Sequence, residues 1–306
     1  MSKIKNLAFK GGGVLGIAYA GALKVLEKEN ILAGIEKVAG TSAGAITAML
    51  VCLNYSADQT QAIVNGTGFK SFEDKEDPLR IPFTYGLYAG DTLLKFIQNG
   101  VTGTGFNLPG INPTGLKANA TFADFKNHVG ENGAKTKDLH VFSTDLNMQT
   151  VQEFSFETTP DTIVAEAVRA SMSIPLFFKA WQFSNHKPNS HIFVDGGVVY
   201  NYPLTAFDSA SGINMETLGF YLTDNKAPVD NGLKMDHIGK YVKYLFETVL
   251  DSQVVDFDKD PEMMGRTVLI DDLGISATDF DLTAQQETDL YNSGVTGTTN
   301  YFKTHP

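Results

Sequence analysis

The chain has 306 residues, of which 42% are hydrophobic and 19% charged, and this globular composition argues against a disordered protein. A single cysteine, Cys52, excludes an intramolecular disulfide, and no apolar run reaches the roughly 18 residues that a spanning helix needs. The net charge is −11, and residues 201–306 hold 7 Lys or Arg against 17 Asp or Glu. Such an acidic surface repels a polyanion, so we expect no nucleic-acid partner.

The first 65 residues predict alternating strands and helices. Buried strands are expected at Ile4–Phe9 and Ile35–Ala39, because both are short apolar runs bounded by turn residues. A helix is expected from about Gly16 to Glu29, and a second one, with a single apolar face, continues from Ile46 to Leu53. Charged residues interrupt the apolar run of the first helix, so we expect no secretion signal and a cytoplasmic or peripheral membrane location.

Residues 66–118 differ from the rest of the chain because glycine, proline and aromatic residues are dense there. A helix at about Asp91–Gln98 interrupts this insert. Long irregular inserts in compact domains are usually functional or disordered, and the aromatic residues argue against disorder. The insert is therefore predicted to be either a lid over a pocket or an ordinary packed excursion.

Further strands and helices follow the insert. The pattern predicts a helix near Asp161–Ala170, an amphipathic core-facing helix at about 238–249, and a final helix at Thr283–Phe302. Strands are predicted at Leu139–Thr144, Val151–Phe156, Ile192–Val194, Leu218–Leu222 and Thr267–Ile270. No repeat or linker divides the chain, so a single α/β domain over 1–306 is expected.

A glycine turn, Gly11-Gly12-Gly13, follows the first predicted strand. The stretch Gly11–Gly16 fits G-x-G-x-x-G, and Glu36 lies about 20 residues on, which is the pattern of a dinucleotide site. The same backbone amides at a helix start also suit the oxyanion of an acyl-transfer intermediate. The turn alone leaves both functions open.

A second motif favours acyl chemistry. Gly40-Thr41-Ser42-Ala43-Gly44 is G-x-S-x-G between a predicted strand and a predicted helix, the setting of a nucleophile elbow. The glycines Gly40 and Gly44 leave room for strand and helix to cross, while the turn exposes the Ser42 hydroxyl. In a dinucleotide fold, the second strand would instead end at a ribose-binding acid.

A nucleophilic serine needs a base, and the sequence offers two kinds. None of the six histidines has a setting that marks it as catalytic, and His305 lies too close to the chain end. Asp195 ends a predicted apolar strand and precedes Gly196 and Gly197, so it is a candidate base at the edge that holds the elbow. A simple Asp-Gly turn is the competing interpretation.

The chain resembles the patatin-like phospholipases over nearly its whole length. The resemblance lies in the order of three motifs, which are the glycine turn, the early G-x-S-x-G and the late D-G-G. Further matching stretches are Gly16–Leu23, Arg169–Pro175 and Asp195–Pro203. The resemblance implies an α/β fold, a three-layer α/β/α sandwich with a mainly parallel central sheet. It also implies a catalytic dyad of Ser42 and Asp195, with an oxyanion hole formed by the backbone of Gly11, Gly12 and Gly13.

The implied activity is hydrolysis of fatty-acyl esters of the phospholipase A or lysophospholipase type, through an acyl-enzyme and without metal or cofactor. An acyltransferase with the same dyad is an alternative. The implied partner is a lipid substrate met at a membrane or micelle. An apolar trough for the acyl chain is expected among the aromatic residues of 81–118 and Leu176-Phe177-Phe178.

Two positions depart from the resemblance. Lys10 stands where many members have an acid, and Leu15 stands where many have Arg or Lys. A cation there would help to stabilise an oxyanion, so Leu15 predicts reduced activity rather than an inactive enzyme.

Overall fold

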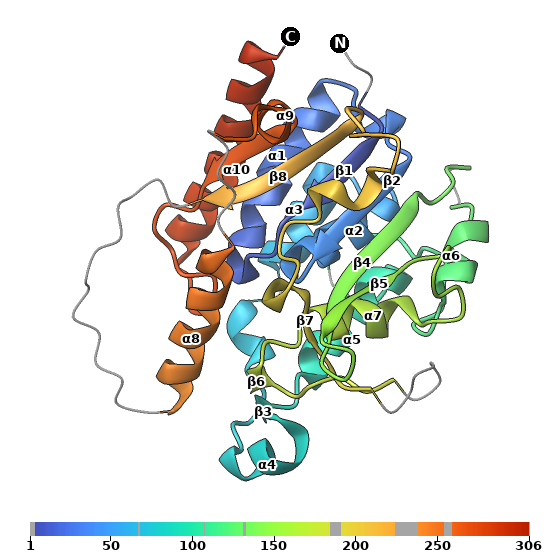
Figure 1. Ribbon diagram of the computed structural model, residues 1–306. Coiled ribbons are helices and arrows are strands. Elements are labelled where there is room, and N and C mark those ends of the chain that lie inside the picture. Colours follow the sequence, from blue (N-terminus) through green and yellow to red (C-terminus); the bar gives the residue numbers. More distant parts are fainter. Residues whose placement is uncertain are drawn as a thin grey trace.

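Seven strands from the described part of the chain form one twisted sheet in the computed structural model (Figure 1). The structure describes residues 4–66, 68–106, 108–130, 133–183, 191–223, 238–253 and 259–305. The strand order is β5-β4-β2-β1-β8-β9, and β7 pairs with β4. The strands are β1 (Asn6–Phe9), β2 (Lys37–Thr41), β4 (Asp138–Asp145), β5 (Thr150–Phe154), β7 (Phe193–Asp195), β8 (Thr217–Thr223) and β9 (Thr267–Asp271).

Most neighbouring strands of this sheet are parallel. The pairs β1–β2, β1–β8, β2–β4 and β8–β9 run in the same direction, whereas β5 and β7 run antiparallel to β4. β1 lies in the middle of the sheet and is buried throughout, as its unbroken apolar sequence predicts. The α/β class with a mainly parallel sheet is therefore confirmed.

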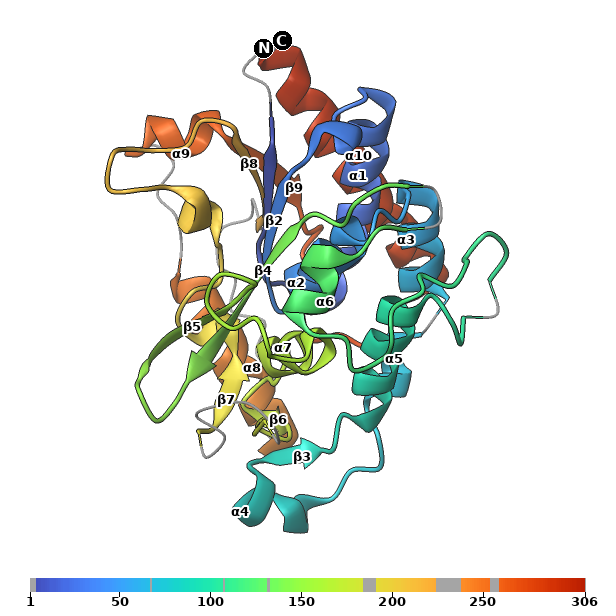
Figure 2. The same cartoon turned by 90° about the vertical axis from the view of Figure 1, so that its right-hand side faces the viewer.

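Helices cover the sheet (Figure 2), with α1 (Ile17–Lys28), α2 (Ala43–Cys52), α3 (Ala57–Asn65) and α10 (Ala284–Thr304) together on one face. All ten residues of α2 are buried, although the sequence predicted a single apolar face. The reason is that α5 (Asp91–Thr102) and α7 (Val164–Ser171) pack against its outer side. Small residues make this fully enclosed helix possible.

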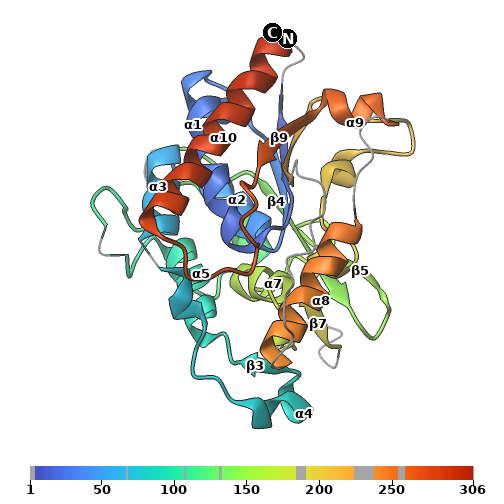
Figure 3. The ribbon, with the colours of Figure 1, turned by 90° about the vertical axis from the view of Figure 1, so that its left-hand side faces the viewer.

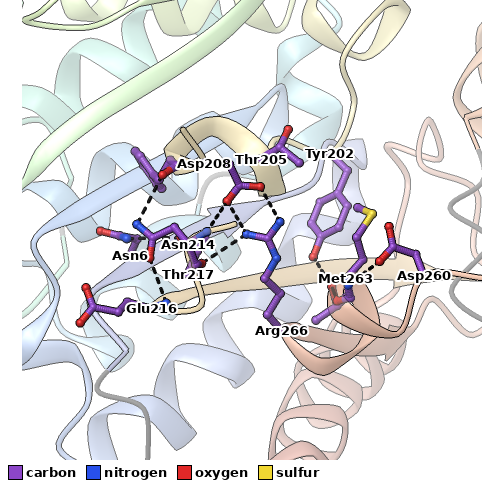
Figure 4. A network of polar contacts seen from close by, with 12 residues as sticks. Asn6, Tyr202, Thr205, Asp208, Asn214, Glu216, Thr217, Asp260, Met263 and Arg266 are labelled. Atoms are coloured by element: carbon purple, nitrogen blue, oxygen red, sulfur yellow. Dashed lines mark hydrogen bonds and ion pairs between the residues drawn. The ribbon is translucent and has the colours of Figure 1, made fainter. Parts of the chain in front are cut away.

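The opposite face of the sheet is covered by the chain that follows β7 and by α9 (Pro261–Gly265), which lies at the upper right in Figure 3. A partly buried ion pair fastens this chain to the residue that precedes β9 (Figure 4). Arg266 donates to both carboxylate oxygens of Asp208, at 2.7 Å each, and the bidentate pair fixes the geometry.

The predicted insert at 66–118 is ordered in the ranges that the structure describes. It contains α4 (Ile81–Thr84), β3 (Gly86–Tyr88) and α5, and β3 pairs with β6 (Leu176–Phe178) in a separate two-stranded sheet. In Figure 1, α4 forms the lower tip of the molecule, at the end toward which α8 (Ile238–Ser252) also extends. No helix among the described residues is both long and apolar enough to cross a membrane.

Candidate active site

Ser42 occupies a sharp turn between β2 and α2. Its backbone has φ 52° and ψ −125°, a strained conformation for a residue with a side chain. A Cβ on Gly40 would lie 2.2 Å from the Gly44 carbonyl oxygen, and one on Gly44 would lie 2.3 Å from the Phe9 carbonyl oxygen. Strand and helix therefore cross only because both positions are glycine, as the motif predicted.

The Ser42 hydroxyl donates a hydrogen bond to Asp195, with 2.7 Å between Oγ and Oδ2. The other carboxylate oxygen, Oδ1, accepts from the backbone N–H of Gly197 at 2.7 Å. Asp195 is the last residue of β7, and it lies opposite Ser143 of β4. We expected the strand before Asp195 to end at the same edge of the sheet as β2. Because β7 instead runs antiparallel to β4, Asp195 approaches Ser42 from the direction opposite to that of β2.

Both members of the Ser42–Asp195 pair are enclosed by protein. Ser42 is 4% exposed and Asp195 is 0% exposed. Burial raises the pKa of Asp195 to about 7, although the hydrogen bonds from Ser42 and Gly197 and the charge of Arg169 act in the opposite direction. A carboxylate with this pKa is a far better proton acceptor near neutral pH than an aspartate in water.

A buried serine, Ser171, supports the strained turn. Its Oγ accepts a hydrogen bond from the backbone N–H of Ser42 at 2.8 Å and donates to the Phe142 carbonyl at 2.5 Å. Ser171 thus ties the elbow to β4 through the end of α7. Ser171 lies within the stretch Arg169–Pro175 that resembles the family. That position was the one hint in the sequence that Ser171 belongs to the site, and it predicted no role for the side chain.

Arg169 is fully buried and connects the insert to the segment that holds Asp195. Its guanidinium donates to the carbonyls of Ala89 and Gly90 at 3.0 and 3.2 Å and to Ser173 Oγ at 2.8 Å. The Ser173 carbonyl in turn accepts the backbone N–H of Asp195 at 2.9 Å. Burial lowers the pKa of Arg169 to about 10, so the side chain keeps its positive charge at neutral pH.

The glycine turn lies beside Ser42, but its three amides differ. The Gly11 N–H donates to the Asn201 carbonyl at 2.9 Å, which leaves Gly12 and Gly13 as the turn's candidate oxyanion donors. Gly13 has φ +54°, and a Cβ there would lie 1.9 Å from the Ala277 carbonyl oxygen. Leu15 is buried and apolar, so it adds no donor.

The dinucleotide alternative does not fit the position of Glu36. This residue precedes β2 at the end of the strand far from the elbow, and its carboxylate lies 3.5 Å from Lys5 Nζ. A ribose-binding acid would have to follow β2, where Ser42 stands instead. Among the described residues, no three His, Cys, Asp or Glu side chains gather in a group that could hold a metal ion.

An apolar pocket opens from Ser42 into the helical layer. Its walls come from the glycine turn, the first turns of α2, the insert and the chain around β6, and they are largely aliphatic and aromatic. Phe178 and the insert residue Phe96 line it, whereas Phe177 instead packs against Tyr88 and Phe280. The lining residues include Ala43, Ile46, Val64, Phe69, Phe72, Met172, Ile174 and Phe280.

A second, smaller cavity lies beside the Ser42–Asp195 pair, and its cover comes partly from the helix predicted at about 238–249, which the sequence had not linked to the site. Phe246 and Leu250 of α8 line it together with Ala277 and Thr278. The predicted core-facing side of α8 is present in Val242, Phe246 and Leu250, which are buried. Residues of α8 and of segment 277–278 therefore line the cavity beside Ser42 and Asp195, whereas the insert contributes to the apolar pocket.

Comparisons with known proteins agree with this arrangement. The chain is 28% identical over 309 residues to uncharacterized protein R571 of Acanthamoeba polyphaga mimivirus, covering 96% of this chain and 92% of that protein. It is 26% identical over 211 residues to probable lipid hydrolase 463L of Invertebrate iridescent virus 6, covering 65% and 62% of the two chains. The structure of VipD from Legionella pneumophila has a similar fold, with a TM-score of 0.65, 17% identity, and coverage of 99% and 67%.

The family comparison covers the glycine turn, the elbow and the Asp-Gly-Gly turn in a single match. Residues 7–208 match the model of the patatin-like phospholipases, and this range includes both Ser42 and Asp195. It spans about two thirds of the chain, from β1 to the segment after β7. The chain belongs to the patatin-like phospholipase family.

Proposed function

We propose that this protein is a lipid acyl hydrolase in which Ser42 is the nucleophile and Asp195 the general base. The observation that carries the proposal is the 2.7 Å hydrogen bond from Ser42 Oγ to a buried carboxylate, at the mouth of an apolar pocket. Family membership and the likeness to a probable lipid hydrolase support the same substrate class. The pocket is suited to a fatty-acyl chain because its walls offer few polar groups.

The proposed reaction proceeds through an acyl-enzyme. Ser42 Oγ bonds to the ester carbonyl carbon while its proton passes to Asp195, and the carbonyl electron pair moves onto oxygen. Collapse of this intermediate breaks the ester bond, and the leaving alcohol takes the proton from Asp195. Water then attacks the acyl-enzyme and loses a proton to Asp195. The bond from the acyl carbon to Ser42 Oγ breaks, Oγ takes that proton from Asp195, and the fatty acid leaves with Ser42 restored.

The test compares wild type with Ser42→Ala and Asp195→Asn on a phospholipid mixture and on a soluble p-nitrophenyl ester. We expect both variants to lose at least about 10³-fold in kcat while they remain folded, and fluorophosphonate to label Ser42 in wild type. Ser155→Ala is the matched control, because Ser155 is an equally buried serine whose Oγ contacts Thr158 instead of the dyad. Full turnover by either dyad variant would refute these roles.

The acyltransferase alternative uses the same acyl-enzyme and differs in the acceptor. Adding a long-chain alcohol or a lysophospholipid to the wild-type reaction separates the two activities by product analysis. Free fatty acid as the main product indicates a hydrolase, whereas an acylated alcohol or a diacyl phospholipid indicates an acyltransferase.

A further inference from the structure

Asn201 has a buried side chain whose polar atoms are unpaired. The residue is 2% exposed, and within the described ranges neither Oδ1 nor Nδ2 has a hydrogen-bond partner. A buried amide without hydrogen-bond partners destabilises the folded state, so folded proteins rarely retain one without a reason. The cost is recovered when a ligand supplies the missing partner.

The backbone N–H and the backbone carbonyl of Asn201 are both hydrogen-bonded, so the base of its side chain is fixed in place. Its N–H donates to Gln253 Oε1 at 3.0 Å, and its carbonyl accepts from the Gly11 N–H at 2.9 Å. Asn201 thereby joins the glycine turn to the end of α8. A Cβ on Gly11 would lie 2.3 Å from Asn201 Oδ1, so the amide packs directly against that turn.

The same side chain faces the dyad. Asn201 lines the small cavity over the dyad together with Gly12, Gly13, Ser42 and Asp195. Nδ2 has no acceptor among the described residues, so its two hydrogens remain as donors for a ligand in that cavity. An uncharged amide donor in an enclosed site is suited to an oxygen on which negative charge develops.

We propose that Asn201 is a catalytic residue whose Nδ2 donates a hydrogen bond to the oxyanion, alongside the amides of Gly12 and Gly13. The inference rests on the proposed hydrolase function and deepens it. When Ser42 Oγ bonds to the carbonyl carbon and the proton moves to Asp195, the electron pair collects on the carbonyl oxygen, and Asn201 stabilises that charge. This donor takes the place of the Gly11 N–H, which is already hydrogen-bonded to the Asn201 carbonyl.

The test measures steady-state hydrolysis of p-nitrophenyl butyrate, the pre-steady-state burst, and the rate of fluorophosphonate labelling at Ser42. For Asn201→Ala we expect kcat and the labelling rate to fall about 10²–10³-fold, because loss of one oxyanion donor has this effect elsewhere. KM should stay within about threefold, because the donor acts on the charged intermediate more than on the ester. Asn6→Ala is the matched control, since Asn6 is also a buried amide but contacts Thr217, far from the dyad.

Asn201→Leu is the second variant, in case the alanine variant does not fold. Leucine is used rather than aspartate, because an aspartate in this enclosed place beside Asp195 could itself carry a donating proton. Leucine keeps the approximate size of the side chain and removes every donor, and the same fall in kcat and labelling is expected. Rates within threefold of wild type in either variant would overturn the assignment, as would an unchanged burst with slowed deacylation alone. If wild type and Asn6→Ala neither label nor hydrolyse, the proposed function itself fails, and this inference falls with it.

Discussion

At the residue scale, the enclosed carboxyl of Asp195 makes the proposed chemistry depend on pH near neutrality. The base must be ionised to accept the serine proton, and burial raises its pKa to about 7. We therefore expect kcat/KM for a soluble ester to rise about tenfold per pH unit below pH 7 and to level off above it. Fluorophosphonate labelling measured from pH 5 to pH 9 should follow the same curve. A rate that is independent of pH over this range would contradict the assignment of the base.

The raised pKa of Asp195 also makes the stability of the folded protein depend on pH. The native state retains the Asp195 proton up to about pH 7, whereas an unfolded chain loses it near its ordinary pKa of about 3.9. The stability that the protonated carboxyl contributes is therefore lost as the pH rises between these values. Asp195→Asn should accordingly unfold at a higher temperature than wild type at pH 8, and the difference should shrink at pH 5.

At the element scale, the first turns of α2 connect the nucleophile to acyl-chain selection. Ile46 lies one turn after Ser42 and lines the apolar pocket. Ile46→Phe adds volume there, so we expect the ratio of kcat/KM for p-nitrophenyl decanoate to that for butyrate to fall about tenfold or more. Ile46→Val is the control, because it keeps the pocket open and should leave the ratio within about threefold. An equal loss on both esters would show that the substitution disturbs Ser42 rather than the acyl chain.

The elements also show how far the sequence could predict the structure. Local signals predicted β1, β2 and the elbow between β2 and α2. The strands follow from short apolar runs, and the elbow follows from glycines at a set spacing around Ser42. The pairing of Ser42 with Asp195 depended on the family resemblance, because their 153-residue separation carries no local signal. The catalytic roles of the pair and of the glycine turn stay predictions.

What the sequence did not predict depends on contacts between distant segments. The full burial of α2, the antiparallel approach of β7, and the cover that α8 gives to the dyad all arise from packing that one segment cannot encode. The hydrogen bond from the Gly11 N–H to the Asn201 carbonyl is another such contact, because the two residues lie near opposite ends of the family match. Whether the insert at 66–118 moves as a lid stays a prediction.

At the scale of the whole molecule, the sheet ends that carry the dyad face the same end as the α4 tip (Figure 1). Two apolar side chains on this tip, Leu79 and Phe83, are each 81% exposed. The acidic excess of the chain lies instead in residues 201–306. The two exposed side chains favour docking on lipid through the tip of the insert, where the headgroups meet apolar surface.

The double variant Leu79→Ser/Phe83→Ser tests this orientation. Burying a large apolar side chain in lipid is worth about 1.5–3 kcal/mol, so losing two should weaken binding to phosphatidylcholine vesicles by more than about tenfold. Hydrolysis of vesicle lipid should fall in parallel, while hydrolysis of soluble p-nitrophenyl butyrate stays unchanged, because neither residue lines the pocket at Ser42. Ile213→Ser/Met215→Ser is the matched control, since these exposed apolar residues precede β8 at the opposite end of the sheet. If the two double variants weaken vesicle binding equally, docking does not depend on the α4 tip, and the acidic part of the chain must be allowed to approach the bilayer.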